Sequence, residues 1–101
     1  MHVLYMVVER YRSGATDEIS KRFRECGRQM PPGLHYVDSW VDLGSTTCFQ
    51  LMRTDDPDLF QVWIEAWSDL VEFEITPVRS SAEAAAASAD RAARKRRRDA
   101  V

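Results

Sequence analysis

The chain has 101 residues with 45% hydrophobic and 30% charged side chains and a formal net charge of −2, which fits one globular domain and leaves no room for two. No apolar run approaches the roughly 18 residues of a membrane-spanning helix. The first residues lack the basic segment and apolar stretch of a signal peptide. Two cysteines do not make a disulfide framework, so we expect free thiols, no membrane insertion and a cytoplasmic location.

Charge and composition divide the chain in two. Residues 80–101 hold six basic and three acidic side chains and residues 1–79 hold eight and 13, so the net charges are +3 and −5. The apolar residues of the second part are almost all alanines, too little surface to offset the entropy lost on ordering. Ser80 and Glu83 have the spacing of a capping box, and alanine favours helix. We predict a folded domain over 1–79 and a basic, Ala/Arg-rich tail over 80–101 that is partly helical or disordered.

The first third of the chain predicts a buried strand followed by a helix. Residues 2–10 are rich in Val, Leu, Tyr and Met and contain no strand breaker. Over residues 16–30, apolar side chains from Ile19 to Met30 recur at steps of four, three and four, which predicts a helix. The Pro-Pro-Gly sequence at 31–33 ends it.

Two alternating segments, residues 35–43 and 47–53, predict a β-hairpin. We place a three-residue loop between them, over 44–46, because a two-residue loop would mix apolar and polar side chains on each face. This register pairs Trp40 with Gln50. It also gives the hairpin one common apolar face, formed by Val37, Val41, Phe49 and Leu51.

The second helix has the clearest start signal in the chain. Asp56 is the predicted N-cap, and Pro57 occupies the first helical position. Apolar residues between Leu59 and Leu70 then follow a rhythm of three and four. Residues 71–78 alternate again and predict the last strand.

The order strand-helix-strand-strand-helix-strand predicts an α+β, ferredoxin-like domain. Both helices then cover one face of a four-stranded antiparallel sheet with the spatial strand order 4-1-3-2. The other face stays open, and it is too polar for a core and too aromatic for a surface that meets only water. Two such sheets packed face to face would enclose a cavity. The residues predicted on the open face are Tyr36, Asp38, Trp40, Cys48, Gln50, Met52, Glu72 and Glu74.

Four segments of the body carry a resemblance: residues 4–10 (LYMVVER), 36–40 (YVDSW), 48–52 (CFQLM) and 67–74 (WSDLVEFE). In order and spacing they resemble a bacterial family of short proteins, the domain of unknown function 3303, over about residues 3–82. The family is similar in layout to the dimeric α/β-barrel proteins. These include cofactor-free monooxygenases, muconolactone-type isomerases, stress-responsive barrel proteins and polyketide-tailoring enzymes. The resemblance implies the fold and a homodimer, but no catalytic residues.

The predicted open face carries the candidate site. Asp38 and Glu74 are candidates for a general base, because a carboxylate beside Trp and Met in a dry cavity becomes basic enough to take a proton. Gln50 would position a carbonyl or an oxyanion, and Trp40 would stack on a planar ligand. The alternative is that the carboxylates face solvent or an interface, since alternation shows facing and not reactivity. The predicted catalytic residues are Asp38, Glu74 and Gln50, and the predicted ligand-binding residues are Trp40, Tyr36, Met52, Cys48, Glu72, His35, Tyr5 and Trp63.

Several of these side chains also have a plainer structural interpretation. Trp63, Trp67 and Tyr5 would pack in the core. Cys48 has no neighbouring histidine to activate it, and His35 would be a single exposed histidine at a strand start. No spacing of His or Cys is typical of a metal site, and we predict neither a metal nor a cofactor.

The arginine-rich run at 94–98 would suit nucleic acid, an anionic membrane surface or an acidic partner. It lacks aromatic residues to stack bases and follows an acidic body, so we favour a solvated tail over nucleic-acid binding. The leading functional prediction is a cofactor-independent enzyme for proton transfer, isomerisation, cyclisation or oxygenation of a small apolar organic molecule. The alternatives are a non-catalytic ligand-binding or regulatory dimer, and an adaptor that works through the tail.

Overall fold

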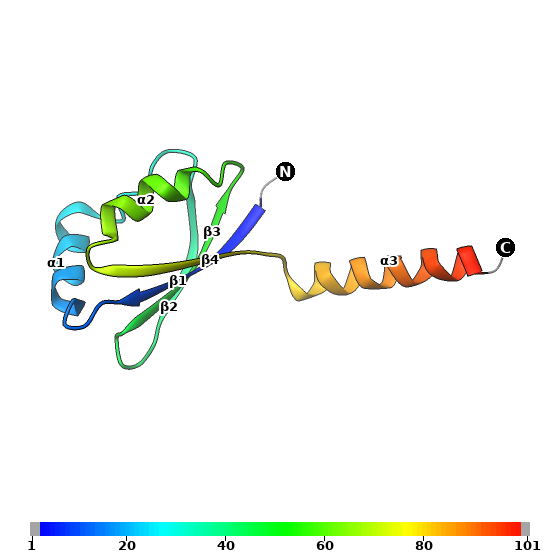
Figure 1. Ribbon diagram of the computed structural model, residues 1–101, viewed down its shortest axis with the longest axis horizontal. Helices are drawn as coiled ribbons and strands as arrows, with labels where there is room; N and C mark the ends of the chain where they lie inside the picture. Colours follow the sequence, from blue (N-terminus) through cyan, green and yellow to red (C-terminus); the bar gives the residue numbers. More distant parts are fainter. Residues whose placement is uncertain (1–2, 100–101) are drawn as a thin grey trace.

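The body of the protein is a four-stranded antiparallel sheet with two helices on a single face (Figure 1). The computed structural model describes residues 3–99. The strands lie in the order β2-β3-β1-β4, which confirms the predicted ferredoxin-like fold and its strand order. The elements in chain order are β1 (Val3–Tyr11), α1 (Thr16–Cys26), β2 (His35–Val41), β3 (Thr47–Thr54), α2 (Leu59–Trp67), β4 (Val71–Val78) and α3 (Ser81–Asp99).

Local hydrogen bonds set the ends of the two body helices. α1 stops short of its predicted end because Gly27 takes a left-handed φ of 66° and donates its N–H to the Phe23 carbonyl at 2.9 Å. α2 begins at Leu59, later than the predicted N-cap Asp56. Asp56 still supports the preceding turn, since its carboxylate accepts the Asp58 N–H at 3.0 Å.

The predicted pairing of Trp40 with Gln50 is wrong. Ser39 lies opposite Gln50, and Trp40 lies opposite Phe49. Because successive side chains of a strand point to opposite faces, a slip of one residue exchanges the faces of β2 relative to β3. The hairpin therefore lacks the common apolar face predicted for Val37, Val41, Phe49 and Leu51.

The turn between β2 and β3 explains the slip. The Asp42 N–H donates to the Thr47 carbonyl at 3.0 Å, so the loop holds one residue more than predicted. The Asp42 carboxylate accepts the Thr46 N–H at 2.7 Å and the Thr47 N–H at 2.9 Å, and the Thr46 hydroxyl donates to it at 2.8 Å. These bonds hold the longer loop in one geometry, and that geometry sets the register.

The helices cover the face of β3 that the sequence pattern assigns to the open side. Cys48 is 7% exposed and Met52 is fully buried, whereas Phe49 on the other face is 39% exposed. Both faces of β3 carry side chains that can be buried, so alternation alone does not show which face the helices cover. The buried core beneath the helices consists of Val7, Leu34, Met52, Phe60, Trp63 and Trp67.

The open face of the sheet keeps an apolar centre. Trp40 is 53% exposed there, opposite the half-exposed Phe49. Beside this centre, Arg10 pairs with Glu74 at 2.8 Å and Arg12 pairs with Glu72 at 3.2 Å. Cross-strand pairing defines the apolar sheet patch as Met6, Val8, Trp40, Phe49 and Leu51.

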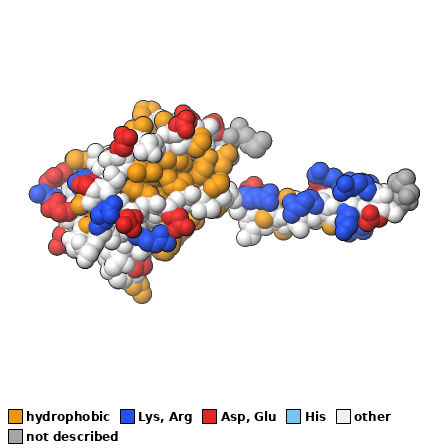
Figure 2. All heavy atoms as spheres, viewed as in Figure 1, with side chains coloured by type: hydrophobic (Ala, Val, Ile, Leu, Met, Phe, Trp, Pro, Cys, Tyr) orange, Lys and Arg blue, Asp and Glu red, His pale blue; other side chains and the backbone are white. Residues whose placement is uncertain are grey.

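The third helix, α3, projects away from the body (Figure 1). Half of the predicted capping box is present at its start: the Ser80 hydroxyl oxygen accepts the Glu83 N–H at 3.0 Å, and the hydroxyl donates to the Glu83 carboxylate at 3.3 Å. None of the α3 residues is buried. Figure 2 shows Lys and Arg side chains gathered along the helix, outside the acidic body.

Candidate functional site

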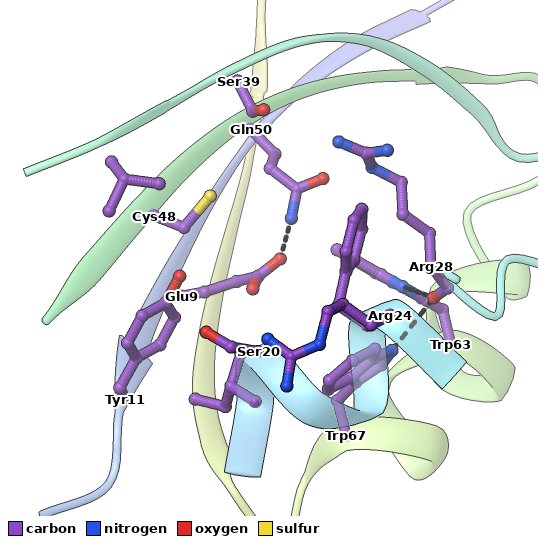
Figure 3. A pocket seen from close by; sticks show the side chains of 13 residues that line it. Glu9, Tyr11, Ser20, Arg24, Arg28, Ser39, Cys48, Gln50, Trp63 and Trp67 are labelled. Atoms are coloured by element: carbon purple, nitrogen blue, oxygen red, sulfur yellow. Dashed lines mark hydrogen bonds between the residues drawn. The ribbon is translucent and has the colours of Figure 1, made fainter. Parts of the chain in front are cut away.

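A cavity of about 350 Å³ lies between the covered face of the sheet and α1 (Figure 3). Its wall combines side chains from three strands, from both body helices and from the turn that follows α1. Charged and amide groups in the wall are Glu9 and Gln50 on the sheet, and Arg24 and Arg28 on the side of α1. The volume falls within the usual range of small-molecule sites.

Glu9 is the buried carboxylate of this cavity. It shares the covered face of β1 with Tyr5 and Val7, and it is only 8% exposed. The side-chain amide of Gln50 on β3 donates to Glu9 Oε1. Burial raises the pKa of Glu9 to about 7, against the opposing effects of the Gln50 hydrogen bond and the positive charge of Arg28. Glu9 can therefore both accept and release a proton near neutral pH.

Only one of the two polar atoms of the Gln50 side-chain amide has a hydrogen-bond partner within residues 3–99. Its Nε2 group donates to Glu9, as the dashed line in Figure 3 marks. Its Oε1 atom is buried and has no hydrogen-bond partner within residues 3–99. A buried acceptor without a donor is uncommon in folded proteins, and this one belongs to a residue that lines a cavity. A ligand that offers an N–H or O–H would satisfy it.

Arg28 is fixed at both its backbone and its side chain. Its carbonyl oxygen accepts the indole N–H of Trp63 at 3.0 Å and that of Trp67 at 2.9 Å. Its guanidinium carbon lies 3.7 Å from the ring centre of Tyr36 and 5.1 Å from that of Phe23. The two indoles of α2 and the two stacked rings thus hold this cation at the cavity.

Arg24 lies one helical turn before Arg28 and adds a second cation to the wall. Within the described part of the chain, the structure gives neither arginine a carboxylate partner. Arg22 on the same helix differs, since two of its nitrogens donate to the Asp69 carboxylate at 2.7 Å. The cavity wall therefore carries two guanidinium groups that form no ion pair within residues 3–99, and the charge of one of them, Arg28, acts on the Glu9 carboxylate.

Two further titratable groups of the cavity stay protonated at neutral pH. Burial is the main cause that raises the pKa of the Cys48 thiol to about 11 and the pKa of Tyr11 to about 12. A thiol at this pKa is a poor nucleophile, which favours the packing interpretation of Cys48. Proton exchange in the neutral range thus belongs to Glu9.

The structure does not bring the three predicted catalytic residues together. Gln50 lies beneath the helices, whereas Asp38 and Glu74 lie on the open face. The one-residue slip of the hairpin separates Asp38 from Gln50. Glu74 lies opposite Val8, which faces Phe49 and not Gln50 on the next strand. The Asp38 carboxylate accepts the Ser39 N–H at 2.8 Å, and Glu74 pairs with Arg10 at 2.8 Å. Neither carboxylate shares a cavity with Gln50.

The predicted ligand-binding residues divide in the same way. Cys48 and Trp63 line the cavity with Gln50. Tyr36 supports the Arg28 guanidinium from the covered side. Met52 belongs to the core and Tyr5 packs against it. The residues that lie on the open face are His35, Trp40 and Glu72.

Sequence reasoning missed Glu9, Arg24 and Arg28. A signal for Glu9 was present, because it interrupts an apolar strand at a position that alternates with Tyr5 and Val7. A carboxylate in such a place is either paired or functional. No comparable signal marks the two arginines, since charged residues near a helix end are common on exposed surfaces.

Within residues 3–99, no group of three or more His, Cys, Asp or Glu side chains is placed to hold a metal ion. Over the same residues, no helix has the length and apolar character needed to span a membrane.

Residues 3–92 match the family described as a domain of unknown function (DUF3303), so the match runs beyond residue 82 into α3. No curated protein matches the chain. One similar solved structure is described as an antibiotic biosynthesis monooxygenase from Chloroflexus aurantiacus J-10-fl, with 18% identity, 80% of this chain and 96% of that chain covered, and a TM-score of 0.48. By the match over nearly its whole length, the chain belongs to the DUF3303 family.

Proposed function

We propose that the protein is a small-molecule enzyme that transfers a proton within the cavity between α1 and the sheet. Glu9 acts as the general base and acid, and the Gln50 side-chain amide positions the Glu9 carboxylate through its Nε2 hydrogen bond. One observation carries the proposal: a buried carboxylate and a buried, half-satisfied amide meet on the wall of a cavity of small-molecule size.

The proposed reaction needs no oxidant. The Glu9 carboxylate takes a proton from the carbon beside a carbonyl, and the electron pair of that C–H bond moves onto the carbonyl oxygen to give an enolate. The positive charge of Arg28, which acts on Glu9 across the cavity, also stabilises the enolate oxygen. Protonated Glu9 then returns the proton to the same carbon, which exchanges its hydrogen. Where a C=C bond is conjugated with the enolate, the proton goes instead to the far end of that bond, the double bond shifts, and the substrate is isomerised.

Hydrogen–deuterium exchange tests this step without knowledge of the natural product. Aryl and cyclic ketones are incubated with the protein in D₂O, and deuterium at the carbon beside the carbonyl is followed by NMR. We expect catalysed exchange with at least one ketone, and Glu9→Gln should reduce it by about a hundredfold, the scale of general-base catalysis. Glu65→Gln is the matched control. It replaces a glutamate by glutamine in the same way, but Glu65 is exposed on α2 and does not line the cavity.

The same experiment judges the alternatives. Exchange that survives in Glu9→Gln but is lost in Asp38→Asn or Glu74→Gln would move the chemistry to the open face and overturn the proposal. Absence of exchange with every ketone would also contradict it and leave the non-catalytic ligand-binding protein as the better interpretation.

We further propose that two copies associate through the open face of their sheets. The support is the apolar sheet patch, in which Trp40 is more than half exposed. The cavity beneath the helices lies on the opposite side of each sheet, so dimerisation would leave it accessible.

A further inference from the structure

The cavity also indicates what kind of molecule it takes. This step rests on the proposed function, because it concerns the ligand of the same site. Three features of the wall restrict the ligand: two cations without carboxylate partners, one buried acceptor without a donor, and an aromatic lining.

The two arginines of the wall indicate that the ligand carries an acidic group. Arg24 and Arg28 line the cavity from neighbouring turns, while three other arginines of the body, Arg10, Arg12 and Arg22, each pair with a carboxylate of the chain itself. A guanidinium stacked on aromatic rings keeps its N–H edge free for a carboxylate. Arg28 is stacked in this way on Tyr36 and Phe23. The side of the cavity formed by α1 and the turn after it therefore offers guanidinium groups to a ligand carboxylate.

The buried, unpartnered oxygen of Gln50 indicates that the ligand carries a hydroxyl group. Gln50 is 6% exposed, its Oε1 atom has no partner within residues 3–99, and its Nε2 group is already used by Glu9. A ligand O–H would donate to Oε1, where it would also lie beside the Glu9 carboxylate. In Figure 3, Gln50 and Glu9 point toward one another from the sheet, and Arg24 extends from the facing helix.

The aromatic lining and the volume of the cavity favour a small, flat ligand. Trp63, Trp67, Phe23 and Tyr11 supply aromatic surface to the wall. The volume of about 350 Å³ lies near the lower end of the range for small-molecule sites, which favours one or two rings. We infer that the cavity binds a small aromatic hydroxy-acid, with its carboxylate at Arg24 and Arg28 and its hydroxyl donating to Gln50 Oε1.

Calorimetric titration with four related probes tests this inference. The probes are 4-hydroxybenzoate and 6-hydroxy-2-naphthoate, which have both groups, 2-naphthoate, which lacks the hydroxyl, and 6-hydroxy-2-naphthamide, which lacks the negative charge. We expect at least one hydroxy-acid to bind about tenfold or more tightly than either incomplete naphthalene probe, since an unpaired buried polar group or a lost charge-assisted bond costs at least that much.

Variants then assign each ligand group to its residue. Arg24→Gln and Arg28→Gln should weaken the hydroxy-acid about tenfold and leave the amide unchanged. Gln50→Met should weaken the hydroxy-acid but not 2-naphthoate. Lys21→Gln is the matched control, because Lys21 lies on α1 outside this cavity and loses the same charge. Far-UV circular dichroism establishes that each variant is folded.

The outcomes separate this inference from the proposed function. Failure of both hydroxy-acids to bind at millimolar concentration, or equal affinity for the amide, overturns the ligand class. Wild-type affinity in both arginine variants does the same. The deuterium exchange assay with Glu9→Gln uses neutral ketones and a different readout, so its result stands whether or not the acids bind.

Discussion

Glu9 is poorly matched to its surroundings if stability alone is considered. It lies on the covered face of a central strand, beside the core residue Val7, where an apolar side chain would pack without a desolvation penalty. Instead the chain places a carboxylate there and provides one amide hydrogen bond from Gln50. Groups that reduce stability in this way and also line a cavity are typical of functional sites.

The first prediction concerns this conflict. Glu9→Gln should raise the free energy of unfolding at pH 8 by up to about 3 kcal/mol, because the pKa of Glu9 is about 7 in the folded protein against an ordinary value of 4.5. Because the folded pKa is the higher one, the wild-type protein loses stability as the pH rises from about 4.5 to about 7. The gain of the variant should therefore shrink toward zero at pH 5, as urea unfolding at several pH values will show.

The titratable groups that face Glu9 do not change their charge between pH 5 and pH 8, so the pH dependence of stability in this range reports on Glu9. Tyr11 and Cys48 stay protonated over the range, since their pKa values are about 12 and 11. Arg24 and Arg28 are the basic side chains of the facing wall. The Glu65→Gln control should show no such pH-dependent gain. Equal stability of the Glu9 variant and the wild type at pH 8 would show that Glu9 carries no buried charge.

At the scale of the elements, the sequence predicts their kind and order but not the register of one hairpin. The helical stripes and the start at Asp56 lead to the correct layout, because burial of a periodic apolar face determines it. The β2–β3 register depends on the three-dimensional turn around Asp42, and a single residue in that turn exchanges the faces. For the same reason the predicted site combined Gln50 with Asp38 and Trp40, which lie on the opposite face of the sheet.

The second prediction tests the turn. Asp42→Ala should lower the melting temperature at pH 7, because the carboxylate accepts hydrogen bonds from Thr46 and Thr47. These bonds lower the pKa of Asp42 below its usual value, so its contribution to stability is present above the unfolded pKa and is lost as the pH falls through the lower, folded pKa. The difference in melting temperature should therefore narrow in acid. Asp58→Ala tests whether the loss of any acidic residue near a turn has the same effect, because Asp58 is exposed and, within residues 3–99, its carboxylate caps no helix N–H. An equal loss there would contradict a specific role for Asp42.

At the scale of the whole molecule, the acidic body and the basic third helix are expected to be independent units. None of the α3 residues is buried, and the buried core consists of residues from the body. The third prediction is that a chain ending at Arg79 keeps the melting temperature of the full protein and loses only helical circular dichroism signal. A marked fall in the melting temperature would show that α3 contributes to the folding of the body and would overturn the boundary at residues 79 and 80.

Dimerisation is the last prediction, and it follows from how little chain the body has. A domain of about this size buries a modest fraction of its surface, so an additional apolar interface adds substantially to its stability. The apolar sheet patch offers one: Trp40 is 53% exposed and Phe49 is 39% exposed on the face that the helices leave open. A patch of this kind pairs with its own copy about a two-fold axis, because one surface then serves both partners.

Phe49→Glu should therefore convert a dimer into a monomer, since two like charges would meet in the interface without water. Light scattering coupled to size exclusion measures the mass directly, and the melting temperature of the wild type should rise with protein concentration while that of the variant should not. Val62→Glu is the matched control, because Val62 is 54% exposed on α2, away from the open face. A monomeric wild type, or a dimer that survives Phe49→Glu and fails with Val62→Glu, would place the interface elsewhere, because only a contact through the sheet makes Phe49 the sensitive position.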